Sequence, residues 1–238
     1  MAVVNLVEDS VSSKPTAQDA LVLRGVFETI HAESCPTSFN FHMHTVCSDG
    51  QLQPEKLMEQ AIAIGLQGFA ITDHHTVDGY KRAQVWLANY IQANPDRVST
   101  LPHLWTGIEV TSRLLETEVH ILGYAFDFNH LVMEPYLQKH APQGAIASAA
   151  QVIASIHTAG GLAVLAHPCR YRRSPDDLIA AAATLGISGV ETYYAYDNPS
   201  PWRTSLRQTE QVQRLSSTHG LLNTCGSDTH GLSLLQRL

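Results

Sequence analysis

The chain has 238 residues, of which 44% are hydrophobic, so it can bury one large core, and a single α/β barrel fits this length. Its formal net charge of −7 argues against a broad surface for duplex nucleic acid, but it is compatible with a small phosphorylated ligand at a metal site. Four scattered cysteines, a first segment unlike a secretory signal and no long apolar run favour a cytoplasmic protein without a membrane partner.

Residues 1–38 are predicted to form an N-terminal extension. The stretch from Thr16 to Asp19 resembles a helix start, because its polar side chains can cap the first turn. Apolar residues at helical spacing follow it: Leu21, Leu23, Val26, Phe27 and Ile30. We expect this helix to pack against the main body, and a partner-binding helix is the weaker alternative.

Strands and helices alternate over residues 39–238. The predicted strands are Phe39–His44, Gly68–Thr72, Leu104–Val110, Val119–Tyr124, Leu162–Ala166, Gly189–Thr192 and Leu221–Gly226. The predicted helices cover residues 54–64, a segment ending near 94, 145–159, 175–185 and 202–218. The alternation predicts a mainly parallel sheet, whose carboxyl-terminal strand ends would build an active site if it closed into a barrel.

The most informative segment begins with His42 and His44 at the end of the first strand. Residues two apart in a strand point to one face, so both imidazoles face the same way while Phe41 and Met43 face an apolar side. Two imidazoles on one face can bind one metal ion. Asp49 follows in a Ser-Asp-Gly turn, where its carboxylate can reach a second ion.

Further histidines and carboxylates occur near the ends of later strands. They are His74, Glu109, His120, His167, Asp228 and His230, and His120 lies on the second arm of a predicted hairpin. Each residue alone is weak evidence for a site. A set of nine such groups at one end of a barrel indicates metal ions, because buried unpaired charges are costly.

Six segments in order resemble the PHP family, named for polymerase and histidinol phosphatase. They are HMHTVCSDG at 42–50, ITDHHT at 71–76, GIEVT at 107–111, VHILGY at 119–124, AHPCRY at 166–171 and GSDTH at 226–230. The resemblance spans residues 42–230. It implies a distorted (β/α)7 barrel of the PHP type with two or three divalent ions, commonly Mn, Fe or Zn.

The resemblance also divides the ligands among the ions. The first ion would take His42, His44, Glu109 and Asp228. The second would share Glu109 and take His120 and His167, and the third would take Asp49, His74 and His230. All nine positions hold the expected residue types, which favours an active trinuclear site.

The implied activity is a metal-dependent phosphoesterase in which metal-activated hydroxide attacks phosphorus. Asp49, His74, Glu109 and Arg170 are the predicted catalytic residues. Arg170 resembles the arginine that binds substrate phosphate in PHP phosphatases with a HisProGlyArgTyr segment, and the alternative is a solvated loop arginine. Arg172 and Arg173 are weaker choices.

Residues beside the ligands receive secondary roles. His75 could act as an acid or base or could only pack, and Asp73 is expected to orient a ligand. Cys47 and Cys169 are expected to pack rather than bind metal.

The SDG and GSDTH forms fit best the TrpH-like branch, which hydrolyses nucleotides or short oligonucleotides. That branch carries a helical insert between the VHILGY and AHP segments, and the interval from Tyr124 to Ala166 is too short for it here. Substrate choice within small phosphorylated compounds is therefore open. The alternatives are a histidinol-phosphate phosphatase, a non-catalytic metal-binding or regulatory module, and a metal-dependent amidohydrolase.

Overall fold

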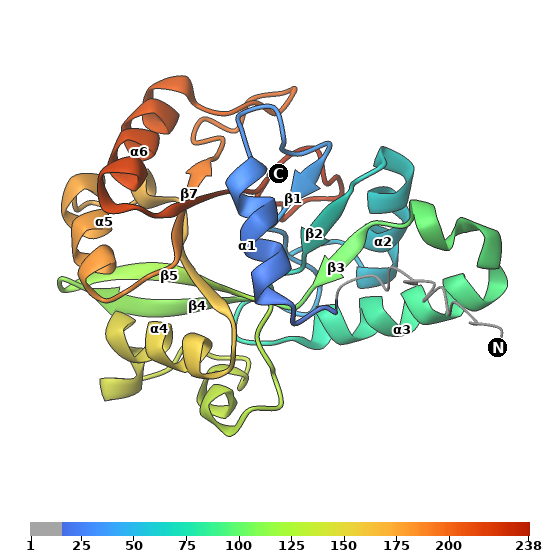
Figure 1. Cartoon of the computed structure of the whole chain (residues 1–238), viewed down its shortest axis with the longest axis horizontal. Coiled ribbons are helices and arrows are strands. Elements are labelled where there is room, and N and C mark those ends of the chain that lie inside the picture. Colours follow the sequence, from blue (N-terminus) through green and yellow to red (C-terminus); the bar gives the residue numbers. More distant parts are fainter. Residues whose placement is uncertain (1–15) are drawn as a thin grey trace, which may run out of the picture.

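The computed structural model describes residues 16–238, which form a mixed α/β fold with two sheets (Figure 1). The first sheet is parallel, in the order β1, β2, β3: Phe39–Asn40, Gly68–Ala70 and His103–Trp105. The second contains β4 to β8 in chain order: Gly107–Leu114, Thr117–Tyr124, Leu162–Leu165, Gly189–Tyr193 and Leu222–Cys225. Residues 1–15 of the predicted extension lie outside the described part of the chain.

The two sheets do not join into a closed ring within residues 16–238. The predicted strand Leu104–Val110 is two strands, because the chain passes from one sheet to the other at Thr106. Isolated bridges, His74 to Glu109 and Met43 to Thr229, and single backbone hydrogen bonds such as that from Phe41 N to Cys225 O connect the two sheets where they meet. The α/β class is therefore confirmed, whereas the predicted barrel is not seen as a closed sheet.

The second sheet is mixed rather than mainly parallel. β5 runs antiparallel to both β4 and β6, and the remaining neighbours are parallel. The β4–β5 hairpin confirms the predicted pairing of the arms that carry Glu109 and His120. Its turn places Leu115 and Glu116 at positive φ, as a tight two-residue hairpin requires.

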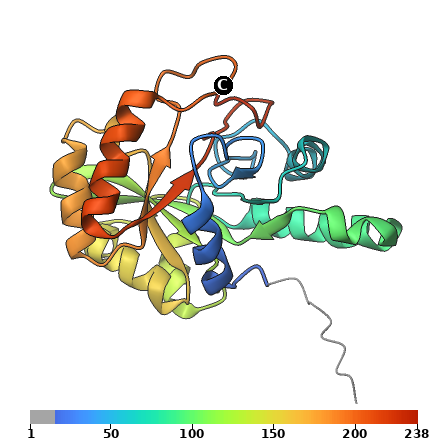
Figure 2. The same ribbon diagram turned by 45° about the horizontal axis from the view of Figure 1, so that its top comes forward.

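Helices cover the outer sides of both sheets. They are α1 (Ala20–Thr29), α2 (Pro54–Ile64), α3 (Asp78–Ala93), α4 (Ala149–Thr158), α5 (Pro175–Thr184) and α6 (Leu206–His219). Figure 1 shows α4, α5 and α6 around the five-stranded sheet, with α2 and α3 beside the three-stranded sheet. In Figure 2, α3 extends away from the body of the molecule. No helix in residues 16–238 combines the length and apolar content that crossing a bilayer needs.

Two predicted helix starts were wrong. The helix predicted to begin at Ala145 begins at Ala149, after a 3-10 turn over Gly144–Ala147, because the Ser148 side chain caps it by accepting a hydrogen bond from Gln151 N. The helix predicted from Trp202 begins at Leu206. Ser205 N donates to Tyr194 O, and Ser205 Oγ accepts from Tyr196 N. These two hydrogen bonds hold Ser205 next to the end of β7, so the residues before it stay irregular.

The first helix packs on the main body as predicted. Asp19 caps α1 by accepting a hydrogen bond from Val22 N. Phe27 is buried, and its ring centroid lies 4.9 Å from Phe41 and 5.5 Å from Tyr124. The packing places α1 behind the strand segment that carries His42 and His44.

Candidate metal centre

The segment from Phe41 to His44 is held in an extended form between two other segments. Phe41 N donates to Cys225 O, His44 N donates to Thr229 O, and Thr72 N donates to Met43 O. This conformation places the fully buried Phe41 and Met43 in the apolar core and turns both imidazoles into the seam between the sheets. The predicted division between an apolar and a histidine-bearing face is confirmed.

Glu109 lies at the centre of the cluster. Its Oε2 is 2.9 Å from His42 Nε2, 3.0 Å from His44 Nε2 and 3.6 Å from His74 Nε2. Its Oε1 is 2.7 Å from His120 Nδ1 and 3.4 Å from His167 Nε2. One buried carboxylate thus faces five imidazoles, with a different set at each oxygen.

Asp228 forms a second carboxylate contact on the other side of the same imidazoles. Its Oδ1 lies 3.2 Å from His44 Nε2 and 3.4 Å from both His42 Nε2 and His230 Nδ1. Gly226 allows this approach, since a Cβ there would collide with the His42 Cβ and lie 2.8 Å from Glu191 Oε1.

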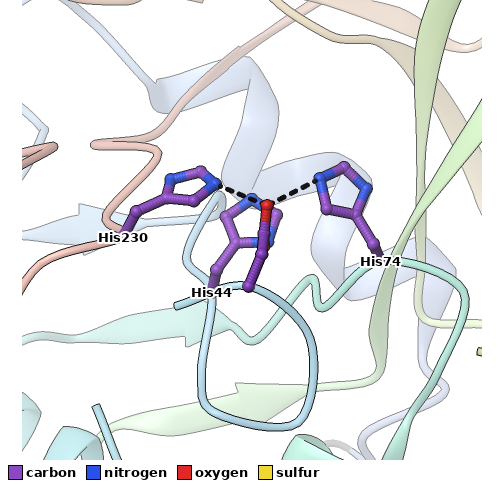
Figure 3. Close-up of side chains that lie close together, drawn as sticks. His44, His74 and His230 are labelled. Carbon is purple, nitrogen blue, oxygen red and sulfur yellow. Dashed lines mark ion pairs between the residues drawn. The ribbon is translucent and has the colours of Figure 1, made fainter. Parts of the chain in front are cut away.

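Asp49 closes the cluster on its exposed side. Its Oδ2 is 3.2 Å from His230 Nε2 and 3.7 Å from His74 Nε2, and Figure 3 shows His44, His74 and His230 around this carboxylate. The Asp49 side chain is 53% exposed, in contrast to the buried Glu109 and Asp228. A ligand can therefore reach the cluster from the Asp49 side.

The residue predicted to orient a ligand, Asp73, supports the Asp49 turn. It accepts hydrogen bonds from Thr45 N at 2.6 Å, Thr45 Oγ1 at 2.7 Å and Ser48 Oγ at 2.8 Å. Asp73 thus fixes the start of the turn.

Several buried ring nitrogens in the cluster lack hydrogen bonds. They are Nδ1 and Nε2 of His44, Nδ1 of His74 and Nδ1 of His167. His44 Nε2 lies within 3.2 Å of two carboxylate oxygens, yet neither contact has hydrogen-bond geometry. Nitrogen and oxygen atoms that face a common point rather than one another fit a shared cation, and the mixed donors suit Mn, Fe or Zn.

The structure brings all nine predicted ligands together, and their grouping matches the expected one in part. The set predicted for the first ion recurs unchanged, the set predicted for the third recurs with His44 added, and the set predicted for the second does not recur. Four overlapping sets have atoms close enough to share an ion: His44, Asp49, His74 and His230; His42, His44, Glu109 and Asp228; His42, His167 and Glu191; and His74, Glu109 and His120. His44 belongs to two sets, and His167 is grouped with Glu191 rather than with His120. The division by ion therefore stays a prediction.

The charged groups of the cluster shift one another's pKa values strongly. Burial lowers the pKa of His44, but Asp228 and Glu109 outweigh it and raise the pKa to about 9. Burial raises the pKa of Glu109, but His42 and His120 hold it well below its usual range. The pKa of His74 falls to about 4, chiefly through burial. The cluster combines ionised carboxylates with histidines that compete for protons, as metal-binding sites do.

Sequence reasoning missed Glu191. Its side chain is fully buried on β7, with Oε1 2.9 Å from His42 Nδ1, while Oε2 accepts a hydrogen bond from His167 N at 2.9 Å. These contacts fix the orientation of His42 and the position of the residue that follows β6. The available signal was a carboxylate inside an otherwise uncharged buried strand.

Arg170 lies at the edge of the cluster, as expected for a group near the substrate. Its Nη1 donates to Asp228 Oδ2 at 3.0 Å and to the Tyr194 hydroxyl at 3.2 Å. Sequence reasoning missed two other residues at this oxygen. Tyr194 donates to it at 2.6 Å, and Arg237 Nε donates at 2.8 Å.

The remaining neighbours have structural contacts. His75 Nε2 lies 3.1 Å from Thr111 Oγ1, and His75 O accepts from Lys139 N, so the interval after Tyr124 reaches the edge of the site despite its short length. Cys47 and Cys169 belong to none of the potential metal-binding groups found within residues 16–238. Their exclusion from the ligand set stays a prediction.

This fold and cluster define an α/β protein with a candidate centre for divalent metal ions. Residues 40–231 match the PHP domain, and the chain belongs to that family.

Curated relatives cover only part of the chain. A 5'-3' exoribonuclease of Haemophilus influenzae is 31% identical over 100 residues, which are 42% of this chain and 33% of that protein. The 5'-3' exoribonuclease Rnm of Escherichia coli is 30% identical over 99 residues, again 42% of this chain and 31% of the relative. The matched stretch thus spans about a third of these relatives.

Solved structures share the fold. An amidohydrolase from Chromobacterium violaceum has a TM-score of 0.66 at 20% identity, and the match covers 82% of this chain and 88% of that one. A protein from Bifidobacterium adolescentis, named as a candidate metal-dependent phosphoesterase, has a TM-score of 0.64 at 24% identity with the same coverage. At identities of 20% and 24%, these matches show a similar fold and nothing further.

Proposed function

We propose that the chain is a metal-dependent phosphoesterase that hydrolyses small phosphorylated substrates such as nucleotides or short oligonucleotides. The observation that carries this proposal is the convergence of six histidines on Glu109 and Asp228 at the seam of the sheets, with Asp49 beside three of them. Membership of the PHP family and the exoribonuclease names of two partial relatives support phosphoester chemistry.

Two or three divalent ions, of Mn, Fe or Zn, are the proposed cofactors. When bound, such ions lower the pKa of a coordinated water and neutralise charge on phosphoryl oxygens. The innermost ion would be held by two buried histidines and two buried carboxylates: His42, His44, Glu109 and Asp228. Asp49, His74 and His230 would hold one on the exposed side, where substrate can approach.

Arg170 is the proposed substrate ligand. Its guanidinium is anchored to Asp228 and is partly exposed, so it can donate to a phosphoryl oxygen beside the ions. Together with Asp49, His74 and Glu109 it forms the proposed catalytic set. We propose that residues 39–238 are the catalytic unit and that it works in the cytoplasm, where its four free cysteines would stay reduced.

The direct test is turnover of a panel of phosphomonoesters, nucleotides and oligonucleotides, read as phosphate release for terminal phosphates and by chromatography of the products for the other substrates. Protein would be stripped of metal, reloaded with Mn, Fe or Zn, and compared with Asp49→Ala. We expect turnover only with metal, and its loss in the variant. Histidinol phosphate and an amide substrate belong in the panel. Faster turnover of histidinol phosphate than of nucleotides would favour a histidinol-phosphate phosphatase, and faster turnover of the amide would favour an amidohydrolase. Stoichiometric metal binding without any turnover would favour a non-catalytic module.

A further inference from the structure

Two arginines from distant parts of the chain meet at one oxygen beside the metal-binding cluster. Asp228 Oδ2 accepts from Arg170 Nη1 at 3.0 Å and from Arg237 Nε at 2.8 Å. The other oxygen of Asp228 faces the imidazoles of His42, His44 and His230 at 3.2–3.4 Å. Both guanidiniums therefore lie one carboxylate away from the predicted metal position.

The segment that carries Arg237 is fixed to the ligand-bearing segment. Arg237 O accepts from His230 N at 2.6 Å and from Gly231 N at 3.2 Å, and Gln236 O accepts from Thr229 Oγ1 at 2.7 Å. Leu234 is fully buried, and its carbonyl accepts from Asn40 Nδ2. These contacts fix the backbone of residues 234–237, and the fixed backbone positions the Arg237 side chain beside Asp228.

Both guanidiniums retain capacity for a ligand. A guanidinium has five N–H donors, and the bond to Asp228 uses Nε of Arg237 and Nη1 of Arg170. The side chains are 39% and 21% exposed for Arg170 and Arg237, respectively, so solvent reaches both. The hydroxyl of Tyr194 also donates to Asp228 Oδ2 and helps hold this carboxylate between the two arginines.

The charge balance at this position favours a strongly anionic ligand. Two arginines share a single carboxylate, which also faces the imidazoles on its other side. A phosphomonoester carries a charge of about −2 above its second pKa of about 6, and three of its oxygens accept hydrogen bonds. An internal phosphodiester carries only one negative charge and has one terminal oxygen fewer.

We propose that Arg237 acts with Arg170 as a two-guanidinium cradle for the reacting phosphoryl group, and that the pair selects monoester dianions over diesters. This inference rests on the proposed function and narrows its substrate class to compounds with a terminal phosphate, such as nucleoside monophosphates. Arg237 is a specificity-determining residue, because its N–H groups contact oxygens that a diester lacks or masks.

The test compares full-length wild type, Arg237→Gln and Arg237→Lys, all metal-loaded at pH 8. The substrates are p-nitrophenyl phosphate and bis(p-nitrophenyl) phosphate. We expect wild type to prefer the monoester and Arg237→Gln to lose about 10- to 100-fold in kcat/KM for the monoester. The loss for the diester should stay below about threefold, with partial rescue of the monoester rate by Arg237→Lys. Arg207→Gln, which removes an exposed arginine from α6, is the charge-matched control and should change neither rate.

A second readout separates this inference from the proposed function. Binding of inorganic phosphate to the metal-loaded proteins would be measured by titration calorimetry, with metal content and melting temperature determined in parallel. We expect Arg237→Gln to bind phosphate about 10-fold more weakly at unchanged metal content. If wild type hydrolyses neither substrate, the proposed function fails, and phosphate binding alone then decides the role of Arg237. Equal phosphate affinity in both proteins, or equal losses on both substrates, would overturn the cradle.

Discussion

At the scale of single residues, Glu109 connects the parts of the candidate site. Its two oxygens face different imidazoles, and the side chain is almost fully buried on β4. No other carboxylate described here contacts both His42 and His120. Removing its charge should therefore disturb both of the ions that Glu109 is predicted to share rather than one subsite.

Glu109→Gln should abolish metal-dependent activity, with a loss of more than about 100-fold, because an amide cannot bridge cations as a carboxylate does. Metal content after dialysis checks the cause, and it should fall together with activity. Retention of full metal content with wild-type activity would contradict the assigned role.

Glu191 illustrates what a side chain can contribute without facing the substrate. It orients His42 through Nδ1 and accepts from the backbone at His167. Glu191→Gln should weaken metal affinity by about 10- to 100-fold, as expected for groups that hold a metal-binding histidine in place. Competition with a chelator measures this affinity. Glu210→Gln, at an exposed position of α6, is the control and should leave it unchanged.

Residues placed by local spacing could be predicted from the sequence, whereas residues placed by contacts between distant segments could not. His42 and His44 follow from strand periodicity, and Asp49 follows from its turn. Glu191 was missed because buried carboxylates on strands also occur in ion pairs, and only the fold shows that it meets His42. Arg237 was missed because nothing local in the sequence indicates that its segment packs back against residues 228–230.

At the scale of elements, α1 stabilises the strand segment behind the site. Phe27 contacts both Phe41 and Tyr124, and the Tyr124 hydroxyl donates to Phe41 O at 2.8 Å. Phe41 directly precedes His42, so packing on one face of the segment supports metal binding on the other. The predicted helix and its apolar face were accessible from the sequence, whereas its contact with this segment was not.

Two substitutions in α1 should act in opposite directions. Phe27→Ala should lower the free energy of unfolding by about 3–5 kcal/mol, because it leaves a cavity among aromatic rings. Gly25→Ala should raise it by about 0.5–1 kcal/mol, since a Cβ there meets no neighbouring atom and favours the helix. Urea unfolding measures both. A stabilising Phe27→Ala would show that α1 does not pack as described.

At the scale of the whole molecule, the candidate site lies where the two sheets meet. His74 and Glu109 form a bridge across this seam, and Met43 and Thr229 form another. The sequence predicted the α/β alternation, but not the break at Thr106 that divides the strands between sheets. Sheet closure depends on pairing between segments distant in sequence, which periodicity does not specify.

Metal bound at this seam should stabilise the whole fold. An ion at about 100 times its dissociation constant adds about 2.7 kcal/mol if it binds only the native state. For a chain of this size we expect the melting temperature to rise by roughly 5–10 °C on adding Mn or Zn to stripped protein. Differential scanning calorimetry checks this, with Glu109→Gln as the variant that should not respond. An equal rise in both proteins would place the ions elsewhere.

The most direct measurement is phosphate release during titration of metal into stripped protein. With a nucleoside monophosphate as substrate, the account predicts no activity without metal and a rise that saturates at two or three equivalents. Glu109→Gln should stay inactive throughout. Activity that is independent of metal would contradict a metal-dependent phosphoesterase. So would the absence of both phosphate release and cleavage of a short oligonucleotide with any of Mn, Fe or Zn despite stoichiometric binding.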